Sequence, residues 1–482
     1  MSRSEGVRAF RRGLETQQSG RAREAIDWYQ QAVRHDPSLA PAHFNLAQLV
    51  REQGEIPRAA AHFARAAELR PDAADAWLNL GAMEERLGKF AEAILSYSRA
   101  IATGPADPKG HFNLGNARLA AGDWSGAATA YRQAIAIDPN GADAQWNLAM
   151  ALLGEGRLDE GWAQYEWRWR KQRLDPRSRA DAPLWEGQPL AGKRLVVWRE
   201  QGLGDELLFA TCLSDLIRRG ASVTLVATPR LVTLLRRAFP DVDVVPDGGA
   251  GKLPGPVGPA PADYHVPLGS LPRWLRPSLE SFPTSGAYLV PDRTRSEKWR
   301  SRLVSLPAGP RIGICWRSGL LTEERRRHYS SLTDWAPLFG ERAYQWINLQ
   351  YDDCERELAE AERQFGIRIY RWPGEDLRDD LESVVALMGH LDAVVTAPTV
   401  VSAFAGALGL PTWQPNLGGD WSVFGRIESP WFPTVRVISH LAPGSWSDTL
   451  ARVAVELRVR AVPGPASPAA GLPGDSRPLV SL

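Results

Sequence analysis

The stretch that decides the fold of the first third of the chain is GEIPRAAAHFARAAELRP at residues 54–71, which returns in altered form as GKFAEAILSYSRAIATGP at residues 88–105. The two copies begin 34 residues apart, and four further kinds of position keep the same interval. The columns are Gly20, Gly54, Gly88, Gly122 and Gly156; Ala25, Ala59, Ala93 and Ala127; Tyr29, Phe63, Tyr97, Tyr131 and Tyr165; Ala32, Ala66, Ala100 and Ala134; and Pro37, Pro71, Pro105 and Pro139. Self-similarity at one fixed period indicates an array of similar structural units.

The residue types in these columns fit a unit made of two helices. Glycine tolerates the backbone angles of a turn between helices, small alanines let helices approach closely, and the aromatic ring fills the space beside them. Proline begins the connection to the next unit. The pattern resembles the tetratricopeptide repeat (TPR), which implies an all-α TPR solenoid at residues 1–172, with about five helix pairs, a capping helix and a concave groove.

An asparagine precedes a leucine in four of these units, at Asn45, Asn79, Asn113 and Asn147. Asparagine is a mediocre helix former, so its repeated place inside a helix needs a reason. Either each amide braces a neighbouring helix, or the amides form a ladder that binds the backbone of an extended polypeptide. The column resembles the asparagine ladder of the TPR superhelix in O-GlcNAc transferase, which holds acceptor polypeptides, and we favour the ladder.

After residue 192 short apolar runs alternate with helical segments. The candidate strands are 195–198, 223–226, 242–245, 311–316, 345–350, 367–370, 392–396 and 411–413. This alternation predicts α/β structure with parallel sheets and right-handed crossovers. We expect a linker at 173–192, two Rossmann-like halves at 193–300 and 301–460 with a ligand cleft between them, and a disordered tail at 461–482.

Composition excludes several classes of function. Lys and Arg total 57 against 56 Asp and Glu, a net charge of +1, which argues against a dedicated nucleic-acid or anionic-membrane binder. The three cysteines are too few and too scattered for a disulfide framework or a zinc site. No apolar signal segment is visible, and the uncharged stretch 393–413 contains Pro and Gly residues that suit a strand, turn and helix better than a membrane span. We therefore expect a cytoplasmic protein.

Several motifs after residue 192 resemble those of bacterial TPR-containing glycosyltransferases. The motifs are REQGLGDELLFA at 199–210, GICWRSG at 313–319, RHYSSL at 327–332, NLQY at 348–351, TAPT at 396–399, AGALGLPTW at 405–413 and SPWFP at 429–433. These enzymes have the GT-B fold, are related to the ADP-heptose:lipopolysaccharide heptosyltransferases, and include TPR-linked enzymes that glycosylate flagellins. The resemblance implies an inverting transfer of a sugar from a nucleotide-sugar donor to a Ser or Thr hydroxyl of a protein, with flagellin as a candidate acceptor and with no metal or other cofactor.

The first of these motifs contains the candidate catalytic residues. Gly202 and Gly204 let the backbone approach a ligand in front of a helix, whose N-terminal amides stabilise negative charge. Asp205 stands where the loop becomes a helix, and is either an N-cap or a general base for the acceptor hydroxyl. The resemblance favours the base, because the aspartate of the matching Gly-Asp motif is implicated in that role in heptosyltransferases. Glu206 and Glu200 are further candidates.

A nucleotide-sugar donor needs positive charge or backbone amides at its phosphates. Candidates follow the ends of predicted strands: Arg317, Ser318, Arg327, His328, Tyr329, Gln350, Tyr351, Thr396 and Thr399. The arginines suit phosphate. Gln350 and Tyr351 suit the base or ribose, with packing as the alternative, and Thr399 opens a helix that can meet a pyrophosphate.

Two positions depart from the family pattern. Many relatives have Asp-Thr where this chain has Pro398-Thr399, and a histidine where this chain has Ala403. The loss of both polar groups keeps a second hypothesis open, a TPR interaction scaffold with a catalytically silent GT-B domain. A third is an enzyme that acts on a lipid-linked or polysaccharide acceptor, with an array that only binds partners.

Overall fold

A computed structural model describes residues 3–172, 175–176, 181–200, 202–248, 261–319, 329–440 and 446–460. Two of the candidate donor residues, Arg327 and His328, lie outside the described residues, as do the expected tail at 461–482 and part of the expected linker.

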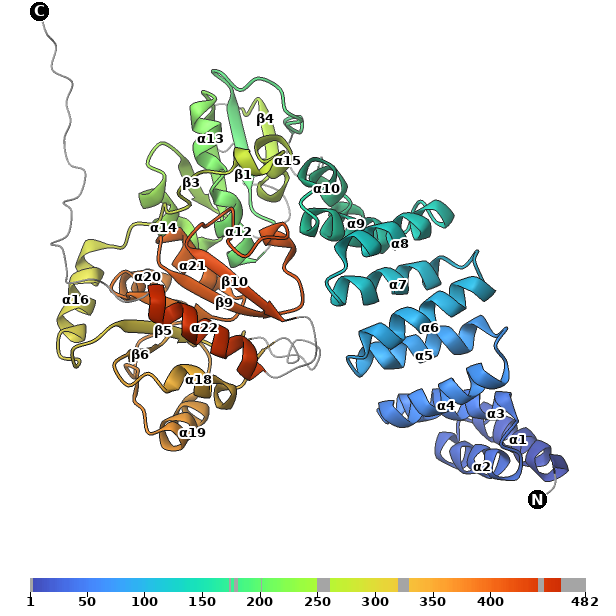
Figure 1. Ribbon diagram of the computed structural model, residues 1–482. Helices are drawn as coiled ribbons and strands as arrows, with labels where there is room; N and C mark the ends of the chain where they lie inside the picture. The colour runs from blue at the N-terminus through green and yellow to red at the C-terminus, as the bar shows by residue number, and fades with distance from the viewer. Residues whose placement is uncertain are drawn as a thin grey trace, which may run out of the picture.

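Within the described part of the chain, five helix pairs form the predicted solenoid, drawn from blue to teal in Figure 1. The helices are α1 (Arg3–Gln18), α2 (Ala22–His35), α3 (Ala40–Glu52), α4 (Ile56–Leu69), α5 (Ala74–Arg86), α6 (Phe90–Thr103), α7 (Pro108–Ala120), α8 (Trp124–Ile137), α9 (Ala142–Gly154) and α10 (Leu158–Tyr165), followed by the short α11 (Arg168–Lys171).

The repeated residues occupy the places that their sizes predict. The five turn glycines have φ between 73° and 85°, the left-handed region that favours glycine. The repeated aromatic side chains are at most 1% exposed. A Cβ on Gly115 would lie 2.5 Å from Cε1 of Tyr131, so a residue without a side chain lets α7 and α8 approach across that ring. The prediction of a TPR solenoid is confirmed.

The second part of the chain is α/β, as predicted. Its first sheet is parallel, in the order β3-β2-β1-β4. Its elements are β1 (Arg194–Trp198), α12 (Leu203–Ala210), α13 (Leu213–Arg218), β2 (Ser222–Ala227), α14 (Val232–Ala238), β3 (Asp243–Pro246), β4 (Tyr264–Pro267) and α15 (Pro272–Leu275), with 3₁₀ turns η2 (Pro229–Leu231), η3 (Leu268–Ser270) and η4 (Leu279–Ser281).

The second sheet is also parallel, in the order β10-β9-β8-β5-β6-β7. Its elements are α16 (Arg293–Leu303), β5 (Arg311–Cys315), η5 (Leu332–Trp335), α18 (Ala336–Phe339), β6 (Gln345–Asn348), α19 (Glu355–Phe365), β7 (Ile369–Tyr370), α20 (Leu381–Met388), β8 (Ala393–Thr396), α21 (Val400–Ala407), β9 (Thr412–Leu417), η6 (Trp421–Val423), β10 (Val435–His440) and α22 (Trp446–Arg460).

Two of the expected boundaries differ from the structure. Helix α16 crosses the expected boundary at residue 300, and Nε1 of Trp299 donates to Oγ of Ser383 in α20 at 3.0 Å, so α16 packs with the second half. In the expected linker, Leu184 forms a parallel bridge with His265 of β4, and the amide of Trp185 donates to the carbonyl of His265 at 2.8 Å. This segment is therefore an edge of the first sheet.

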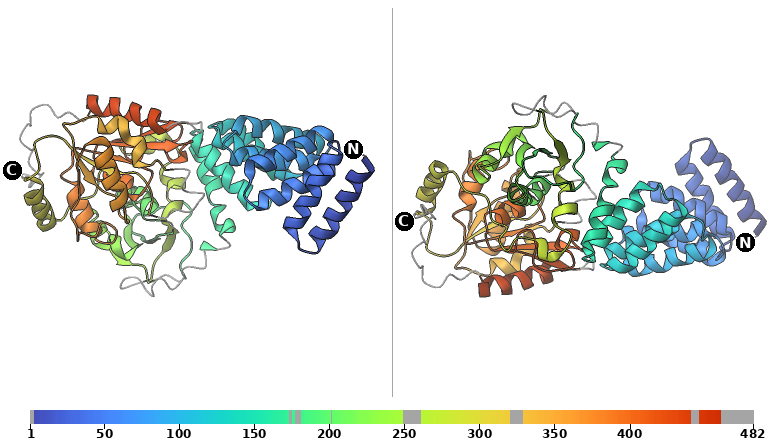
Figure 2. Two further views of the ribbon diagram at one scale, coloured as in Figure 1. Left: turned by 90° about the horizontal axis from the view of Figure 1, so that it is seen from below. Right: turned by 90° about the horizontal axis from the view of Figure 1, so that it is seen from above.

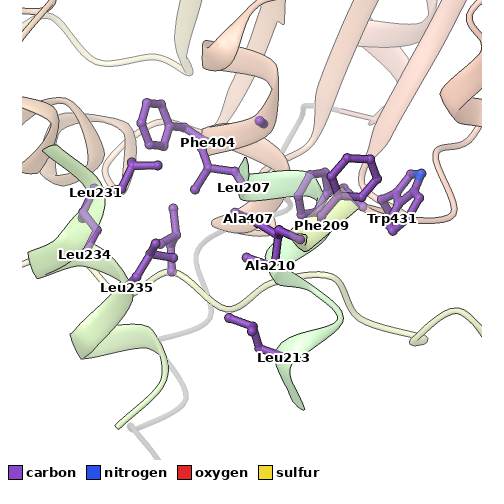
Figure 3. Close-up of a cluster of buried hydrophobic side chains, with 14 of the residues drawn as sticks. Leu207, Phe209, Ala210, Leu213, Leu231, Leu234, Leu235, Phe404, Ala407 and Trp431 are labelled. Atoms are coloured by element: carbon purple, nitrogen blue, oxygen red, sulfur yellow. The ribbon is translucent and has the colours of Figure 1, made fainter. Parts of the chain in front are cut away.

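The two halves share one hydrophobic core, which α12 and α21 form where they pack together. Figure 3 shows Leu207 and Phe209 of α12 beside Phe404 and Ala407 of α21 and beside Trp431. Strand order reverses next to β1 in the first sheet and between β5 and β8 in the second. In open α/β sheets ligands bind outside the carboxyl ends of the strands at such reversals.

Trp162 of α10 lies at the centre of the junction between the array and this α/β unit. The array extends from one side of the unit as an arm, with its N-terminus far from the unit (Figures 1 and 2). Trp162 is 1% exposed, and its Nε1 donates to the carbonyl of Arg276 at 3.0 Å. Its ring lies 5.5–6.4 Å from five aromatic rings, those of Tyr165, Phe209, Trp421, Phe424 and Trp431. Because these come from the array and from both halves, Trp162 holds all three parts together.

We expect Trp162→Ala to cost about 3–5 kcal/mol of stability, because it removes a buried indole from the centre of a packed cluster. Urea denaturation followed by far-ultraviolet circular dichroism measures the loss. The control is Leu95→Ala in α6, where the side chain is 65% exposed, and its effect should stay within about 0.5 kcal/mol. An unchanged unfolding midpoint for Trp162→Ala would contradict this role at the junction.

Candidate functional site

A pocket of about 350 Å³ lies between the two halves, at the carboxyl ends of β1, β5, β6 and β8, and we call it the cleft pocket. Five of the predicted donor-site residues line it: Gly202, Gly204, Ser318, Tyr351 and Thr399. Its other polar side chains are those of Arg230, Asp352 and Arg378. The structure therefore brings together residues from four separate sequence motifs.

Two helix N-termini from different halves meet at the cleft pocket. Helix α12 begins after its N-cap Gly202, and α21 begins after its N-cap Thr399, whose hydroxyl accepts from the amide of Val401 at 3.3 Å. The first residues of both helices line the pocket. A Cβ on Gly204 would lie 4.0 Å from Cα of Val400, so the two backbones run close together here. Amide donors and the positive ends of two helix dipoles favour an anionic group at this place.

A second pocket of about 320 Å³ adjoins the first and contains Asp205, and we call it the Asp205 pocket. It shares Gly204 and Thr399 with the cleft pocket, so these two residues stand between them. Its polar lining includes a hydrogen-bonded chain that the sequence did not reveal. Oγ of Ser402 donates to Oε1 of Gln414 at 2.7 Å, and Nε2 of Gln414 donates to Oδ2 of Asp420 at 3.2 Å.

The pKa of Asp205 suits a general base. Burial raises the pKa of Asp205 to about 6, and the negative charges of Glu200 and Asp420 act in the same direction, against a hydrogen bond with the backbone of Gly202. The N-cap of α12 is Gly202, so Asp205 lies in the first helical turn and not at the N-cap position that one interpretation gave it. A carboxyl group with such a pKa is largely ionised at neutral pH and still basic enough to take a proton.

The other two candidate carboxylates, those of Glu206 and Glu200, point into the protein. Glu206 is 2% exposed, accepts from the amide and hydroxyl of Thr228 at 2.9 and 2.6 Å, and lies 3.4 Å from Nε of Arg199. It ties α12 to the end of β2. Glu200 accepts two hydrogen bonds from Arg168. Neither of the two lines the cleft pocket or the Asp205 pocket, whereas Asp205 does.

Arg317 and Gln350 bind other parts of the protein instead of lining the cleft pocket. The guanidinium of Arg317 is buried, pairs with Asp352 and Glu357, and donates to the carbonyl of Asp353 at 3.3 Å. Nε2 of Gln350 donates to the carbonyl of Arg317 at 3.0 Å and to Oδ1 of Asp352 at 2.7 Å. Gln350 lines a neighbouring pocket of about 290 Å³. The two residues hold the loops after β5 and β6 in shape.

Of the remaining predicted donor residues that the structure describes, one lines the cleft pocket and two line neither the cleft pocket nor the Asp205 pocket. Tyr351 lines the cleft pocket, and its hydroxyl accepts from the amide of Gly319 at 3.3 Å. Thr396 is buried and donates to the carbonyl of Ala397 at 2.9 Å, while Tyr329 is half-buried and lines neither the cleft pocket nor the Asp205 pocket. Pro398 and Ala403 both line the Asp205 pocket, so the two departures from the family pattern fall at this site.

Sequence reasoning missed Asp420, Gln414, Ser402 and Arg230. Asp420 follows the end of β9 and Arg230 follows β2, so position near a strand's carboxyl end was an available signal for these two, whereas Gln414 lies inside β9. Among the described residues, no three His, Cys, Asp or Glu side chains are grouped so as to hold a metal ion. No helix in that part of the chain is long and apolar enough to span a membrane.

The repeated asparagines lie on the first helix of each pair, and all four are half-buried. Nδ2 of Asn45 donates to the hydroxyl of Tyr29 in α2 at 3.3 Å, Oδ1 of Asn79 accepts from Nη1 of Arg51 in α3 at 3.0 Å, and Nδ2 of Asn147 donates to Oδ1 of Asn116 in α7 at 2.9 Å. These bonds give three of the asparagines a bracing role within the array. The binding of a polypeptide by the column stays a prediction, and so does a contribution of Asn113.

The matching family models lie within the repeats, whereas one curated relative is similar over a stretch longer than the array. The tetratricopeptide repeat family matches residues 10–66 and 44–108, and a TPR repeat family matches residues 115–156. Protein FlbA of Caulobacter vibrioides is 36% identical over 318 residues, which cover 64% of this chain and 53% of FlbA, so the chain spans about half the length of this relative.

Two solved structures are also similar to parts of the chain. A crystal structure of MamA is 21% identical with a TM-score of 0.34, covering 38% of this chain and 98% of MamA. YrrB, described as a TPR protein with an unusual peptide-binding site, is 18% identical with a TM-score of 0.33, covering 34% of this chain and 85% of YrrB. The family matches and the helix pairs together show that the chain contains an array of TPR repeats.

Proposed function

We propose that the chain is a glycosyltransferase of the GT-B type that moves a sugar from a nucleotide-sugar donor to a Ser or Thr hydroxyl of a protein bound by the array. The observation that carries the proposal is the pair of adjoining pockets, one between two helix N-termini and one containing the Asp205 carboxyl group. Such a reaction needs an anion site for the leaving phosphate beside a base for the attacking hydroxyl.

The donor phosphates would lie in the cleft pocket, against the first amides of α12 and α21. Arg230 also lines the pocket at its edge, where Asp379 pairs with it: its Nη1 donates to Oδ1 of Asp379 at 2.6 Å and to the carbonyl of Arg378 at 2.9 Å. Oriented amides stabilise the charge that grows on the leaving phosphate without having to reorganise. Arg317 has no part in this arrangement, since Asp352 and Glu357 already pair with it.

In the proposed reaction Asp205 takes the proton of the acceptor hydroxyl while its oxygen attacks the anomeric carbon. The bond from that carbon to the donor phosphate breaks, and the phosphate oxygen keeps the electron pair. A single displacement of this kind inverts the anomeric centre. Gly204 and Thr399, at the shared wall, stand where the donor and the acceptor would meet.

The array ends beside the Asp205 pocket. Trp421 lines that pocket and packs against Trp162 and Tyr165 of α10, with ring centroids 6.1 and 5.9 Å apart. A polypeptide bound along the array would therefore lie close to Asp205, the proposed base. This placement supports a protein acceptor over a lipid-linked one, and flagellin is the candidate that the family resemblance offers.

A second candidate function is an interaction scaffold without catalysis. It is favoured by Pro398 and Ala403, which give the Asp205 pocket apolar groups where many relatives of the resembled family have a carboxylate and an imidazole. Under this alternative the α/β unit binds no nucleotide sugar, so binding of a donor to the wild-type protein separates the two functions.

We expect Asp205→Asn to lower transfer by about a hundredfold or more, because the amide cannot accept the proton. Intact-mass analysis of acceptor proteins mixed with the enzyme and nucleotide sugars measures the transfer. The control is Asp27→Asn in α2, which is exposed and far along the chain from the pockets. Full activity in Asp205→Asn would rule out Asp205 as the base, and a wild type that binds no nucleotide sugar would rule out the enzyme.

The activity should also depend on pH. The base acts in its ionised form and Asp205 has a pKa of about 6, so kcat/KM should be constant above that pH and fall about tenfold per pH unit below it. A pH profile with a fixed donor and acceptor gives the position of this acid limb. A limb near pH 4, where an ordinary aspartate titrates, would contradict the environment described for Asp205.

Replacing Asn79 and Asn113 together with Ala should weaken acceptor binding about tenfold and leave donor hydrolysis unchanged, because each amide would lose about one hydrogen bond to the polypeptide. Fluorescence anisotropy of a labelled acceptor measures the affinity, and circular dichroism checks that the array stays folded. Asn140→Ala, in the exposed turn between α8 and α9, is the matched control. Unchanged affinity in the double variant would leave bracing as the role of the column.

A further inference from the structure

We propose that Arg168 is a positioning residue for this site, because it fixes the loop that carries Asp205 to the end of the TPR array through Glu200. The proposal rests on the proposed function, since a position for Asp205 matters to catalysis only if transfer takes place there. It adds that the array is part of the framework of the reaction site as well as a surface for the acceptor.

The guanidinium of Arg168 has partners on every side. Arg168 lies in α11, directly after the last repeat, and is 1% exposed. Its Nε and Nη2 donate to the two carboxylate oxygens of Glu200 at 2.6 and 2.9 Å, a bidentate pair. The other bonds go to Glu166 at 2.8 Å, to Oγ of Ser270 at 2.6 Å and to the carbonyl of Tyr165 at 3.3 Å. A group held in this way has one available position.

Glu200 connects Arg168 to the loop between β1 and α12. It follows β1 by two residues and precedes Gly202, the N-cap of α12, by two. Its buried carboxylate also accepts from the amide of Gly269 at 2.8 Å, and a Cβ on Gly269 would lie 2.7 Å from Oε1. The carboxylate is therefore enclosed between the array and the first half. This anchor lies two residues before the N-cap of α12, and through it the array would help to set the position of Asp205 in the first helical turn.

The opposite wall of the Asp205 pocket also rests on the array. A Cβ on Gly419 would lie 2.0 Å from Cζ2 of Trp124 in α8, and one on Gly425 would lie 3.0 Å from the carbonyl of Gly154 in α9. Asp420 is in the segment that these two glycines enclose. Both carboxylates of the pocket, Asp205 and Asp420, are therefore held by segments that contact the end of the array.

The charges around Asp205 provide a readout that a purely structural role would not change. Glu200, from the loop before α12, and Asp420, from the segment after β9, both raise the pKa of Asp205, after burial as the main cause. Helix α21, which packs on the other side, has no charged side chain. Neutralising Glu200 should therefore lower the pKa of Asp205 and move the acid limb of activity to lower pH.

The experiment compares Arg168→Lys with Arg276→Lys in the full chain. Arg276 is a matched control, because it is also 1% exposed at this junction, but its Nη2 donates to Asp215 at 2.7 Å and to the carbonyl of Thr211 at 3.2 Å, at the end of α12 opposite to the loop. Lysine keeps the charge and cannot form the bidentate pair. We expect Arg168→Lys alone to lower kcat by about tenfold or more at unchanged donor KM, and to speed hydrogen exchange at residues 202–210.

Equal losses of kcat in the two variants, or unchanged kcat in Arg168→Lys, would overturn the proposal. If Arg168→Lys does not fold, Glu200→Gln keeps the shape of the side chain, and an acid limb that stays at the wild-type pH would overturn it instead. If the wild type transfers no sugar, the proposed function fails by itself. Hydrogen exchange then still tests the link, since equal exchange at 202–210 in Arg168→Lys and Arg276→Lys would show that Arg168 does not fix the loop.

Discussion

The close approach of α12 and α21 is the constraint on which the rest of the α/β unit depends. Gly204 lets the two helices meet near their N-termini, and below it Leu207, Phe404 and Ala407 join the two halves in one core. Because both helices follow strands, their meeting brings the N-terminal ends of two helices to one pocket. It also places Asp205 at the neighbouring pocket, where burial raises its pKa.

Much of the fold could be predicted because local sequence patterns determine its helices and strands. The 34-residue period gave the helix pairs, and apolar runs gave eight of the ten described strands. Strands β4 and β10 were missed. β4 has four residues, ends in Pro267 and follows a run rich in Gly and Pro, so its pairing with β1 depends on a distant partner that no local pattern reveals. The position of α16 is likewise set by its contact with α20 and not by its own sequence.

The site was predictable in part, for a related reason. Gly202, Gly204 and Asp205 stand in one motif, and a strand followed by a glycine turn and a helix places them at a strand's carboxyl end. Arg317 also follows a strand, but Asp352 and Glu357, 35 and 40 residues away, neutralise it. The sequence of a motif does not show whether residues far away in the chain will pair with its charged side chain. Asp420 was missed in the same way, since its closeness to Asp205 exists only after the halves have come together.

The place of Trp162 has a mechanical consequence. Its ring touches Phe209 of the first half and Trp431 of the second, while its backbone belongs to the last repeat. A rotation that opens the space between the halves must slide at least one of these rings across the indole. The array is therefore coupled mechanically to the cleft. A force that bends the array relative to the α/β unit and a change in the distance between the two halves would disturb the same ring contacts of Trp162.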